Sequence, residues 1–534
     1  MTYAICSRKD SSIYSVDEDH PRPECIVISD AHIADRGSLE YIRTNWGDKY
    51  RNGPATASNP LAPKSGVKIY FLPSGHALFP GFSDSHAHVL ATQTSSEVVT
   101  RTRQYVLDNP DVLSDTTRWI VGVGWDQNLW EGQSYPLATV LFDRPIVLYR
   151  IDVHALWVSP KVLQLLGSLP EIVEGGLIVR DDVGSPTGLF IDTAMALIES
   201  IKPAWSENEM LDFFRTAVQD GVRFGLTTIH DAETLPFMIE FFRRMADQGR
   251  LPIRLYLMAH LDDAEYWGDR VGQFQHAGGR LTLRSVKLFA DALGPHCWSP
   301  YSDKADTQGT LIFPPRVING LVHQFVKNGW QTDRANQIVL DAFEEVLESS
   351  STNSSFHRHR IEHAQIMTPE DIIRLAKLEV IASIQPTHAT SDMWYAERRL
   401  GPERIRGAYA WRTLLENGAK IAIGSDAPVE SLNPLLGFYA AVTRLSPEGT
   451  SPNGEGGWYP QQRLTRDEAL RGMTIDAAFA SFTESTQGSL LPGKRADLVV
   501  LSRDIMGVPP EDILKAEVRA TIVDGRLVYG SLDF

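Results

Sequence analysis

Cysteine is scarce in this chain of 534 residues, which contains only Cys6, Cys25 and Cys297. An odd count without regular spacing is unlike a disulfide scaffold, and it favours a reducing compartment. Basic residues are also fewer than acidic ones: the chain has 51 lysines and arginines and 67 aspartates and glutamates, which gives a formal net charge of −16. Nucleic acids and anionic membranes are bound through basic surfaces, so we predict neither as a partner.

Long apolar runs are missing as well. The N-terminus turns acidic after a short apolar start, and no stretch approaches the roughly 20 apolar residues of a membrane helix. We therefore predict no signal peptide, no membrane span and a cytoplasmic location. The composition, 43% hydrophobic and 22% charged, is ordinary for a globular protein with a large core. A small-molecule substrate is the predicted partner, and the sequence leaves a homodimer possible.

Short β segments separated by polar and Pro/Gly-rich stretches make up both ends of the chain. Near the C-terminus, Asp524-Gly525 is a hairpin-turn signal. We predict that residues 1–77 and 486–534 meet in one small β-sandwich beside a catalytic domain formed by residues 78–485. The region at about 91–200 is too long for one crossover and predicts an insertion in the catalytic domain.

The middle of the chain alternates short apolar runs with helical segments, the pattern of a parallel sheet wound with helices. Capping boxes at Ser206 and Thr465, and the pair Thr368-Pro369, mark helix starts. The predicted class is α/β, a (β/α)8 TIM-type barrel with its active site at the carboxyl ends of the strands. Seven of its eight strands can be predicted: 78–88, 226–232, 254–260, 285–291, 360–365, 380–386 and 421–427.

The segment PGFSDSHAH at residues 80–88 carries the sharpest chemical signal. Side chains alternate faces along a strand, so His86 and His88 point the same way. Two imidazoles placed in this manner bind one divalent metal ion such as zinc. A pair of partly buried structural histidines is the alternative, and an isolated His-X-His pair would favour it.

His363 and Asp426 follow two further predicted strands at the same end of the barrel. Taken singly, a histidine after a strand is more often structural, and an aspartate after Gly-Ser is more often a helix cap. Their convergence with His86 and His88 favours a metal site. A carboxylate beside a metal ion can accept a proton from water whose pKa the metal lowers toward ~7, and we predict this catalytic role for Asp426.

Lys287 lies inside an apolar strand, where an ammonium group is costly unless it is paired or chemically altered. Two interpretations stay open. Carbamylation would turn Lys287 into an anionic ligand that bridges two metal ions. Pairing with Asp291 or another barrel carboxylate would make it structural.

The order and wording of the motifs resemble amidohydrolase family 3, the branch with N-substituted formamide deformylases and related metal-dependent amide hydrolases. These motifs span nearly the whole chain: PGFSDSHAH, GWDQNLW, RIDVHA, GGLIVRDDVGSPTG, TTIHDA, VKLFAD, RIEHAQ, QPTHATSDMW, GSDAPVE and PGKRADLVVL. The resemblance implies the same barrel and composite β-sandwich. It implies one or two divalent ions, Zn2+ foremost, on His86, His88, His363 and Asp426. Lys287 falls where the superfamily often has a carbamylated, metal-bridging lysine.

Two of these motifs imply a substrate pocket. Packing of loops and of the insertion is the alternative for the same side chains. Val153 stands within one motif where glycine is usual, so the backbone there is expected to differ. The implied pocket residues are Trp125, Asp126, Trp130, Arg150, Asp152 and His154.

One motif is broken where the fifth barrel strand is expected. The resemblance predicts Gly-Trp-Gln, an apolar run ending in His-Ala-Ile-Gly, and then Asp-Arg-Ala-Asn. Residues 329–336 are GWQTDRAN, so both flanks are present and the piece with the histidine is not. The loss would remove a strand, leave its neighbours with unpaired backbone groups and remove a ligand of a second metal site. Nothing in the spacing of His296 or His323 makes either a substitute.

Three explanations of the gap stay open: a splice or gene-model product, a true variant that works with one metal ion, and a pseudoenzyme that binds a small molecule or partner. The predicted function is hydrolysis of a C–N bond outside peptides, in a small amide, formamide or cyclic amide, with activity impaired if the lost segment is needed. Activated water would attack the carbonyl carbon while Asp426 passes the proton to the leaving amine. Decarboxylation or deamination on the same site is a further alternative.

Overall fold

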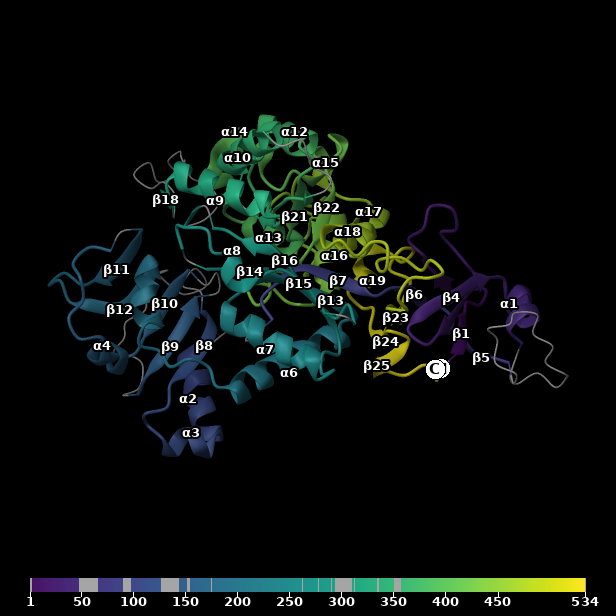
Figure 1. The fold of residues 1–534 in the computed structure, drawn as a ribbon, viewed down its shortest axis with the longest axis horizontal. Coiled ribbons are helices and arrows are strands. Elements are labelled where there is room, and N and C mark those ends of the chain that lie inside the picture. Colours follow the sequence, from purple (N-terminus) through teal and green to yellow (C-terminus); the bar gives the residue numbers. More distant parts are fainter. Residues whose placement is uncertain are drawn as a thin grey trace.

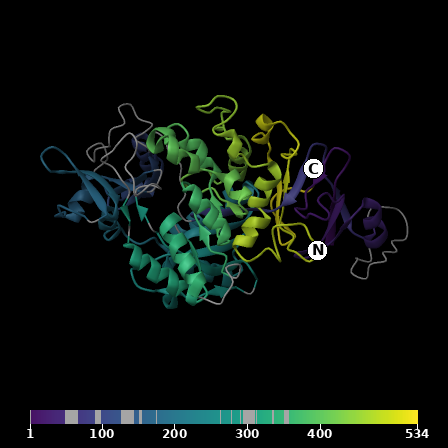
Figure 2. The ribbon, with the colours of Figure 1, turned by 90° about the horizontal axis from the view of Figure 1, so that it is seen from above.

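The computed structural model places three parts in a row, as Figure 1 shows: an inserted sheet at one end, a barrel with its helices in the centre, and a β domain at the other end. Figure 2 shows the same order from above. The residues that the structure describes are 2–47, 66–89, 98–125, 144–150, 154–173, 175–261, 263–276, 278–289, 291–292, 310–311, 313–333, 336–349 and 357–533.

A curled sheet of parallel strands forms the central part. Its order is β22-β21-β20-β19-β16-β14-β13-β7, and an isolated parallel bridge from Ala87 to Ala427 joins the first strand to the segment after the last. The predicted TIM-type class is therefore confirmed. In chain order the strands are β7 (Phe82–Ala87), β13 (Leu226–Thr234), β14 (Arg254–Ala259), β16 (Leu281–Lys287), β19 (Gln331–Asp333), β20 (Arg360–Ile361), β21 (Ile381–Ile384) and β22 (Ile421–Ile423).

The fifth position of the barrel is filled, contrary to the expectation of a skipped strand. β19 has three residues, and it pairs with β16, where Lys287 lies opposite Asp333, and with β20, where Asp333 lies opposite Arg360. Gln331 anchors this short strand, since its Oε1 accepts a hydrogen bond from the Tyr256 hydroxyl at 2.8 Å. β19 is short, but β20 with two residues and β22 with three are equally short, so the truncation of the strand stays a prediction. The predicted loss of backbone pairing beside it is wrong, because three residues suffice to continue the ladder.

Helices follow the strands and cover the outside of the barrel (Figure 1). The capping box predicted at Ser206 is present: its side chain accepts the N–H of Glu209, and the Glu209 carboxylate accepts the N–H of Ser206. In the described part of the chain no helix combines the length and the apolar character that a membrane crossing requires. The helices are α6 (Glu207–Arg223), α7 (Pro236–Asp247), α8 (Gly268–Val271), α9 (Pro315–Lys327), α10 (Asn336–Ser349), α12 (Pro369–Lys377), α13 (Pro386–Asp392), α14 (Ala396–Arg404), α15 (Trp411–Glu416), α16 (Pro434–Thr443), α17 (Arg466–Gly472) and α18 (Ile475–Ala480).

Both ends of the chain build the β domain, which confirms the composite β-sandwich. One sheet, in the order β4-β3-β1-β5, contains β1 (Thr2–Cys6), β3 (Cys25–Ser29), β4 (His32–Gly37) and β5 (Lys68–Phe71). The other has the order β2-β6-β23-β24-β25 and joins N-terminal to C-terminal strands: β2 (Ser12–Ile13), β6 (Ala77–Pro80), β23 (Leu498–Leu501), β24 (Val518–Val523) and β25 (Arg526–Gly530). Asp524 and Gly525 turn the last hairpin with φ of 51° and 69°, as their pairing predicts.

Cys6 and Cys25 form a disulfide within this domain. They are direct partners in the antiparallel pair of β1 and β3, with Cα atoms 4.1 Å apart. The expectation of a chain without disulfides is wrong at this pair. The register of the two strands brings the two thiols together, and this register cannot be predicted from the spacing of the cysteines in the sequence.

A further sheet is inserted between β7 and α6, in the order β11-β12-β10-β9-β8. It has apolar clusters of its own, including Trp125, Ile146, Leu148 and Trp157. Its elements are α2 (Val98–Asp108), α3 (Pro110–Ser114), β8 (Ile120–Trp125), β9 (Ile146–Arg150), β10 (Ala155–Val158), α4 (Pro160–Leu166), β11 (Gly176–Arg180), β12 (Pro186–Asp192) and α5 (Ala196–Glu199).

Candidate metal centre

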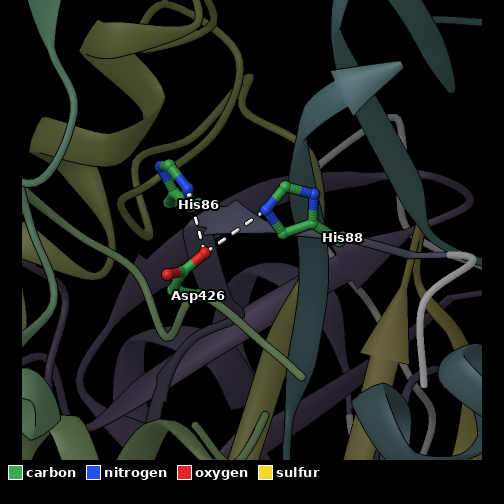
Figure 3. Close-up of side chains that lie close together, drawn as sticks. All are labelled: His86, His88 and Asp426. Carbon is green, nitrogen blue, oxygen red and sulfur yellow. Dashed lines mark ion pairs between the residues drawn. The ribbon is translucent and has the colours of Figure 1, made fainter. Parts of the chain in front are cut away.

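The carboxylate of Asp426 is the point at which the predicted ligands meet. Its Oδ1 lies 3.1 Å from Nε2 of His86 and 3.3 Å from Nε2 of His88, the contacts drawn in Figure 3. Its Oδ2 lies 4.0 Å from Nε2 of His363. The structure therefore brings together four of the side chains that the sequence predicts as metal ligands.

Neighbouring strands supply these side chains. His86 and His88 come from the end of β7, and Asp426 comes from the loop after β22. The backbone N–H of Asp426 donates to the carbonyl oxygen of His86 at 2.7 Å, and that of His88 donates to the carbonyl oxygen of Ala427 at 2.8 Å. The loop is thus tied to the end of β7, and the carboxylate faces both imidazoles.

The side chain of Asp84 also ties the end of β7 to the loop after β22. Its Oδ1 accepts the backbone N–H groups of His86 and Ser425, both at 3.0 Å, and its Oδ2 accepts the hydroxyl of Ser425 at 2.5 Å. Burial raises the pKa of Asp84 to about 6, against the opposing effect of these hydrogen bonds. Gly424 leaves the space for the contact, because a Cβ there would lie 2.5 Å from the backbone nitrogen of His86.

The backbone is left-handed at two of the predicted ligands. His363 has a φ of 67° and Asp426 a φ of 60°. Residues other than glycine hold this conformation where the surrounding structure imposes it, and such positions gather at functional sites. Both residues follow the last residue of a barrel strand closely, so the strain falls where the side chains turn toward the centre.

His86 is held at both ring nitrogens. Its Nδ1 hydrogen-bonds to the carboxylate of Glu362, while its Nε2 faces Asp426. Glu362 is held in turn by Nε of Arg360 at 2.7 Å and by the hydroxyl of Ser383 at 2.5 Å. Sequence analysis missed this carboxylate, although it stands next to His363 in the motif RIEHAQ, because nothing in the spacing links it to His86.

The charges around His86 favour its protonated form. Burial and Lys287 lower its pKa, but Asp426 and Glu362 outweigh both and raise the pKa to about 9. The pKa of Asp426 lies well below its usual range, since His86, His88 and His363 outweigh the effect of burial. Asp426 is therefore an anion at neutral pH, and the proton on Nε2 of His86 occupies the side on which a metal cation would bind.

Lys287 ends β16 and is buried, with 5% of its surface exposed. Burial is the largest effect that lowers the pKa values of His86 and His363, and the positive charge of Lys287 also lowers both. The ammonium group therefore belongs to the same electrostatic site. The side chain of Asp291, the partner suggested by the sequence, lies outside the described residues.

His388 also lies at the centre, and sequence analysis missed it as a candidate ligand. It lies in the first turn of α13, directly after β21, and its Nε2 is 3.5 Å from Oδ2 of Asp426. Its ring stacks on that of His363, with centroids 5.5 Å apart and planes at 22°. The motif QPTHATSDMW contained this residue, but a histidine on a helix has no strand spacing that would connect it to the others.

Two of the predicted pocket residues, Trp125 and Arg150, lie on strands of the inserted sheet. Trp125 is buried, donates its Nε1–H to the carbonyl oxygen of Leu148 at 2.7 Å, and packs edge-on against Trp157. Trp125 is therefore part of the core of that sheet. Arg150 is its partner on β9. The other members Asp126, Trp130 and Asp152, like Val153, lie outside the described residues.

His154 and Tyr149 show how the inserted sheet is arranged. Nδ1 of His154 lies 3.0 Å from Oδ1 of Asp192. Burial and Glu199 raise the pKa of Tyr149, and the charge of Glu233 adds to this effect. Glu233 lies near the end of β13, and its Oε2 is 3.9 Å from Nδ1 of His88. The charge of Glu233 at the end of β13 therefore acts on Tyr149 of the inserted sheet, and substrate binding by the six predicted residues stays a prediction.

Residues 74–529 match the amidohydrolase family. The chain is 30% identical to the amidohydrolase YtcJ of Bacillus subtilis (strain 168), an alignment that covers 97% of this chain and 98% of that protein. It is 26% identical to the N-substituted formamide deformylase of Arthrobacter pascens, over 85% and 89% of the two chains. The fold is similar to that of an uncharacterized metal-dependent hydrolase from Pyrococcus horikoshii OT3, with a TM-score of 0.74 at 23% identity and coverage of 96% and 99%.

Proposed function

Because this chain belongs to the amidohydrolase family, we propose that it hydrolyses a C–N bond outside peptides in a small molecule, with a divalent metal ion bound at Asp426. The observation that carries the proposal is the contact of one buried carboxylate with the Nε2 atoms of His86 and His88. A relative named as a deformylase of N-substituted formamides supports a formamide or another small amide as the substrate class.

The donor set fits a zinc-like ion. Ligands that share such an ion at about 2.0–2.1 Å in tetrahedral geometry lie roughly 3.3 Å from one another. Oδ1 of Asp426 has this separation from the two imidazoles, at 3.1 and 3.3 Å. The carboxylate of Glu362 on the other nitrogen of His86 matches the support that metal-bound histidines commonly have.

When bound, the metal ion supplies a Lewis acid and lowers the pKa of water toward ~7. Asp426 is ionised at neutral pH, because its pKa is held well below the usual range, so it can accept the proton of the attacking water. In the proposed reaction Asp426 then delivers that proton to the leaving nitrogen. A proton-transferring group placed in this way contributes about 10²- to 10⁴-fold to the rate.

Substrate reaches the centre from the side of His88 and His363. Their side chains are 19% and 36% exposed, whereas that of His86 is 1% exposed. Glu362 and Arg360 close the opposite side of His86. The carbonyl of a bound amide would therefore meet the centre on the face that His88 and His363 share.

Lys287 enters the proposal as a carbamate. The ammonium first loses a proton, and the neutral amine then adds to carbon dioxide and loses a second proton, so that an anion replaces a cation beside His86 and His363. The support is electrostatic: a buried ammonium among the ligands opposes the binding of a divalent cation. A carbamate would instead add an oxygen ligand.

Metal content tests the proposal first. The purified full chain is expected to hold metal by elemental analysis, and the double change His86→Ala and His88→Ala is expected to lower the metal content, whereas His276→Ala is the matched histidine control. The metal-loaded protein is then assayed on N-alkyl and N-aryl formamides and on cyclic amides. A folded wild-type chain that takes up no zinc, manganese or cobalt would contradict the proposal.

One observation supports a second candidate, a protein that binds a small molecule without turnover. The three residues of β19, Gln331, Thr332 and Asp333, include no histidine, so the fifth strand supplies no imidazole to the centre. In that case the loaded protein would hydrolyse nothing on the panel. A panel compound would still raise its melting temperature, and Asp426→Asn would leave that shift unchanged.

A further inference from the structure

We propose a second metal position in this chain, formed by His363, His388 and Asp426, in which His388 supplies an imidazole that the shortened fifth strand does not. The inference rests on the proposed function, because Asp426 is shared with the first position. Two positions that share one carboxylate would make the centre a two-metal site.

The two oxygens of Asp426 face different sets of imidazoles. Oδ1 contacts His86 and His88, and Oδ2 lies 3.5 Å from Nε2 of His388 and 4.0 Å from Nε2 of His363. Each set, taken with Asp426, has its ligand atoms within 4.8 Å of one another. A carboxylate with one oxygen toward each of two ions is the arrangement of two-metal sites, in which the ions lie about 3.5–4 Å apart.

Strand order explains how His388 comes to this place. Asp426 follows β22, which has β7 on one side through the Ala87–Ala427 bridge and β21 on the other. The first position takes its imidazoles from β7. The second takes them from β21 and β20, through His388 and His363, and so needs nothing from β19.

The state of His388 fits a ligand better than a structural histidine. Its Nε2 is buried and has no hydrogen-bond partner within the part of the chain that the structure describes, and such a nitrogen is costly unless something binds it. A separation of 3.5 Å from a carboxylate oxygen is long for a hydrogen bond between charged groups, which is about 2.7–2.9 Å. It is close to the roughly 3.3 Å between two ligands of one zinc-like ion.

Packing holds the ring in this orientation. His388 stacks on His363, and His363 packs edge-on against His86 with centroids 4.8 Å apart. Backbone bonding also fixes the turn, since the N–H of His388 donates to the carbonyl oxygen of Gln385 at 3.1 Å. An ion between His363 and Asp426 has to shorten their 4.0 Å separation, and the 36% exposure of His363 leaves its ring the room to move.

The experiment counts ions rather than turnover. The full chain is stripped with a chelator and titrated with Co2+ and, separately, with Zn2+; bound metal is measured by elemental analysis and Co2+ coordination by visible absorption. The variants are His388→Ala, His388→Gln, the pair His86→Ala with His88→Ala, and the control His276→Ala. Thermal unfolding of each stripped variant establishes that it is folded, and the glutamine variant keeps the size of the side chain if alanine disturbs α13.

We expect the wild-type chain and the control to hold two equivalents, both His388 variants one, and the His86/His88 pair one. The single ion of the His388 variants should keep the absorption of the first position. Two equivalents in a folded His388 variant, or a single equivalent in the wild type, would overturn the second position and leave the proposed function standing. A folded wild type that holds no metal would overturn both.

Discussion

Nδ1 of His86 donates a hydrogen bond to the carboxylate of Glu362, and this bond determines that Nε2 faces Asp426. A ring fixed by an anion behind it is oriented before any metal arrives, and it is a stronger donor once the metal is bound. Because Arg360 and Ser383 hold Glu362, the orientation of His86 depends on a short chain of buried polar contacts.

Glu362→Gln should weaken metal binding by roughly 10- to 100-fold without unfolding the barrel, because the amide keeps the size of the side chain and loses its charge. Competition with a chromogenic chelator measures the affinity. Glu240→Gln, an exposed change on α7, is the control. Equal affinity for both variants would mean that Glu362 does not support the ligand.

Asp426→Asn should lower kcat by about 10²- to 10⁴-fold on any compound that the wild type hydrolyses, because an amide cannot accept the proton of the attacking water. The rate is compared with that of Asp247→Asn at the exposed end of α7, where 65% of the side chain is accessible. Metal content is measured on the same samples. A variant that keeps its full rate would exclude Asp426 as the proton acceptor.

Gly424→Ala should destabilise the protein by roughly 1–3 kcal/mol, the usual range for overpacking, and should lower metal affinity. The new Cβ would lie 2.5 Å from the backbone nitrogen of His86 and 2.9 Å from Oδ1 of Asp84, so the junction between β7 and the β22 loop must shift. Chemical denaturation measures the change. Gly320→Ala on α9 meets no atom within 4 Å and should be neutral or slightly stabilising.

Asp524 contributes stability that depends on pH. It pairs with Arg254, with Arg280 at 2.6 Å and with Arg495 at 3.1 Å. Burial would raise its pKa, but Arg254 and Arg280 outweigh burial and lower it below the usual value near 4. A carboxylate whose pKa is lowered by folding stabilises the folded state above its unfolded pKa, and it loses that effect as pH falls through the folded pKa.

Asp524→Asn should therefore lower the free energy of unfolding by roughly 3 kcal/mol near pH 7, and the gap to the wild type should narrow as pH falls below about 4. Thermal unfolding of both proteins between pH 7 and pH 3 measures this difference in the free energy of unfolding. Asp533→Asn removes a carboxylate that is 80% exposed and should have little effect. A gap that stays constant down to pH 3 would assign the loss to packing rather than charge.

The disulfide predicts the number of reactive thiols. Alkylation under denaturing conditions without reductant should label one cysteine of three, because Cys6 and Cys25 are paired, and reduction should raise the count to three. Mass spectrometry of the intact protein reads both values. Three labelled thiols before reduction would mean that the pair is open in the purified protein.

The features that could be predicted from the sequence are those determined by neighbouring residues. The capping boxes at Ser206 and Thr465 act within one helical turn, and both helices begin there. The pair Asp524-Gly525 determines its own turn. The strands that carry His86 and Asp426 were predictable because their apolar runs end in polar groups, and parallel strands bring such ends to one edge.

The features that escaped prediction depend on partners far away in the chain. β19 is polar throughout and becomes a strand only because β16 and β20 pair with it on either side. Glu362 gains its role from a histidine on another strand, and Cys25 gains a bond from the register of β3. His388 lies on a helix, where the alternation that identified His86 and His88 does not apply.

The composite β domain sets an order of events during synthesis. Gly81 alone separates β6 from β7, the strand that carries His86, and β6 pairs with β23, which comes far later in the sequence. β6 is therefore synthesised long before the strand that pairs with it. A nascent chain stalled before Leu498 would expose β6 as an open apolar edge, which makes this edge the natural target of chaperones and of quality-control proteolysis.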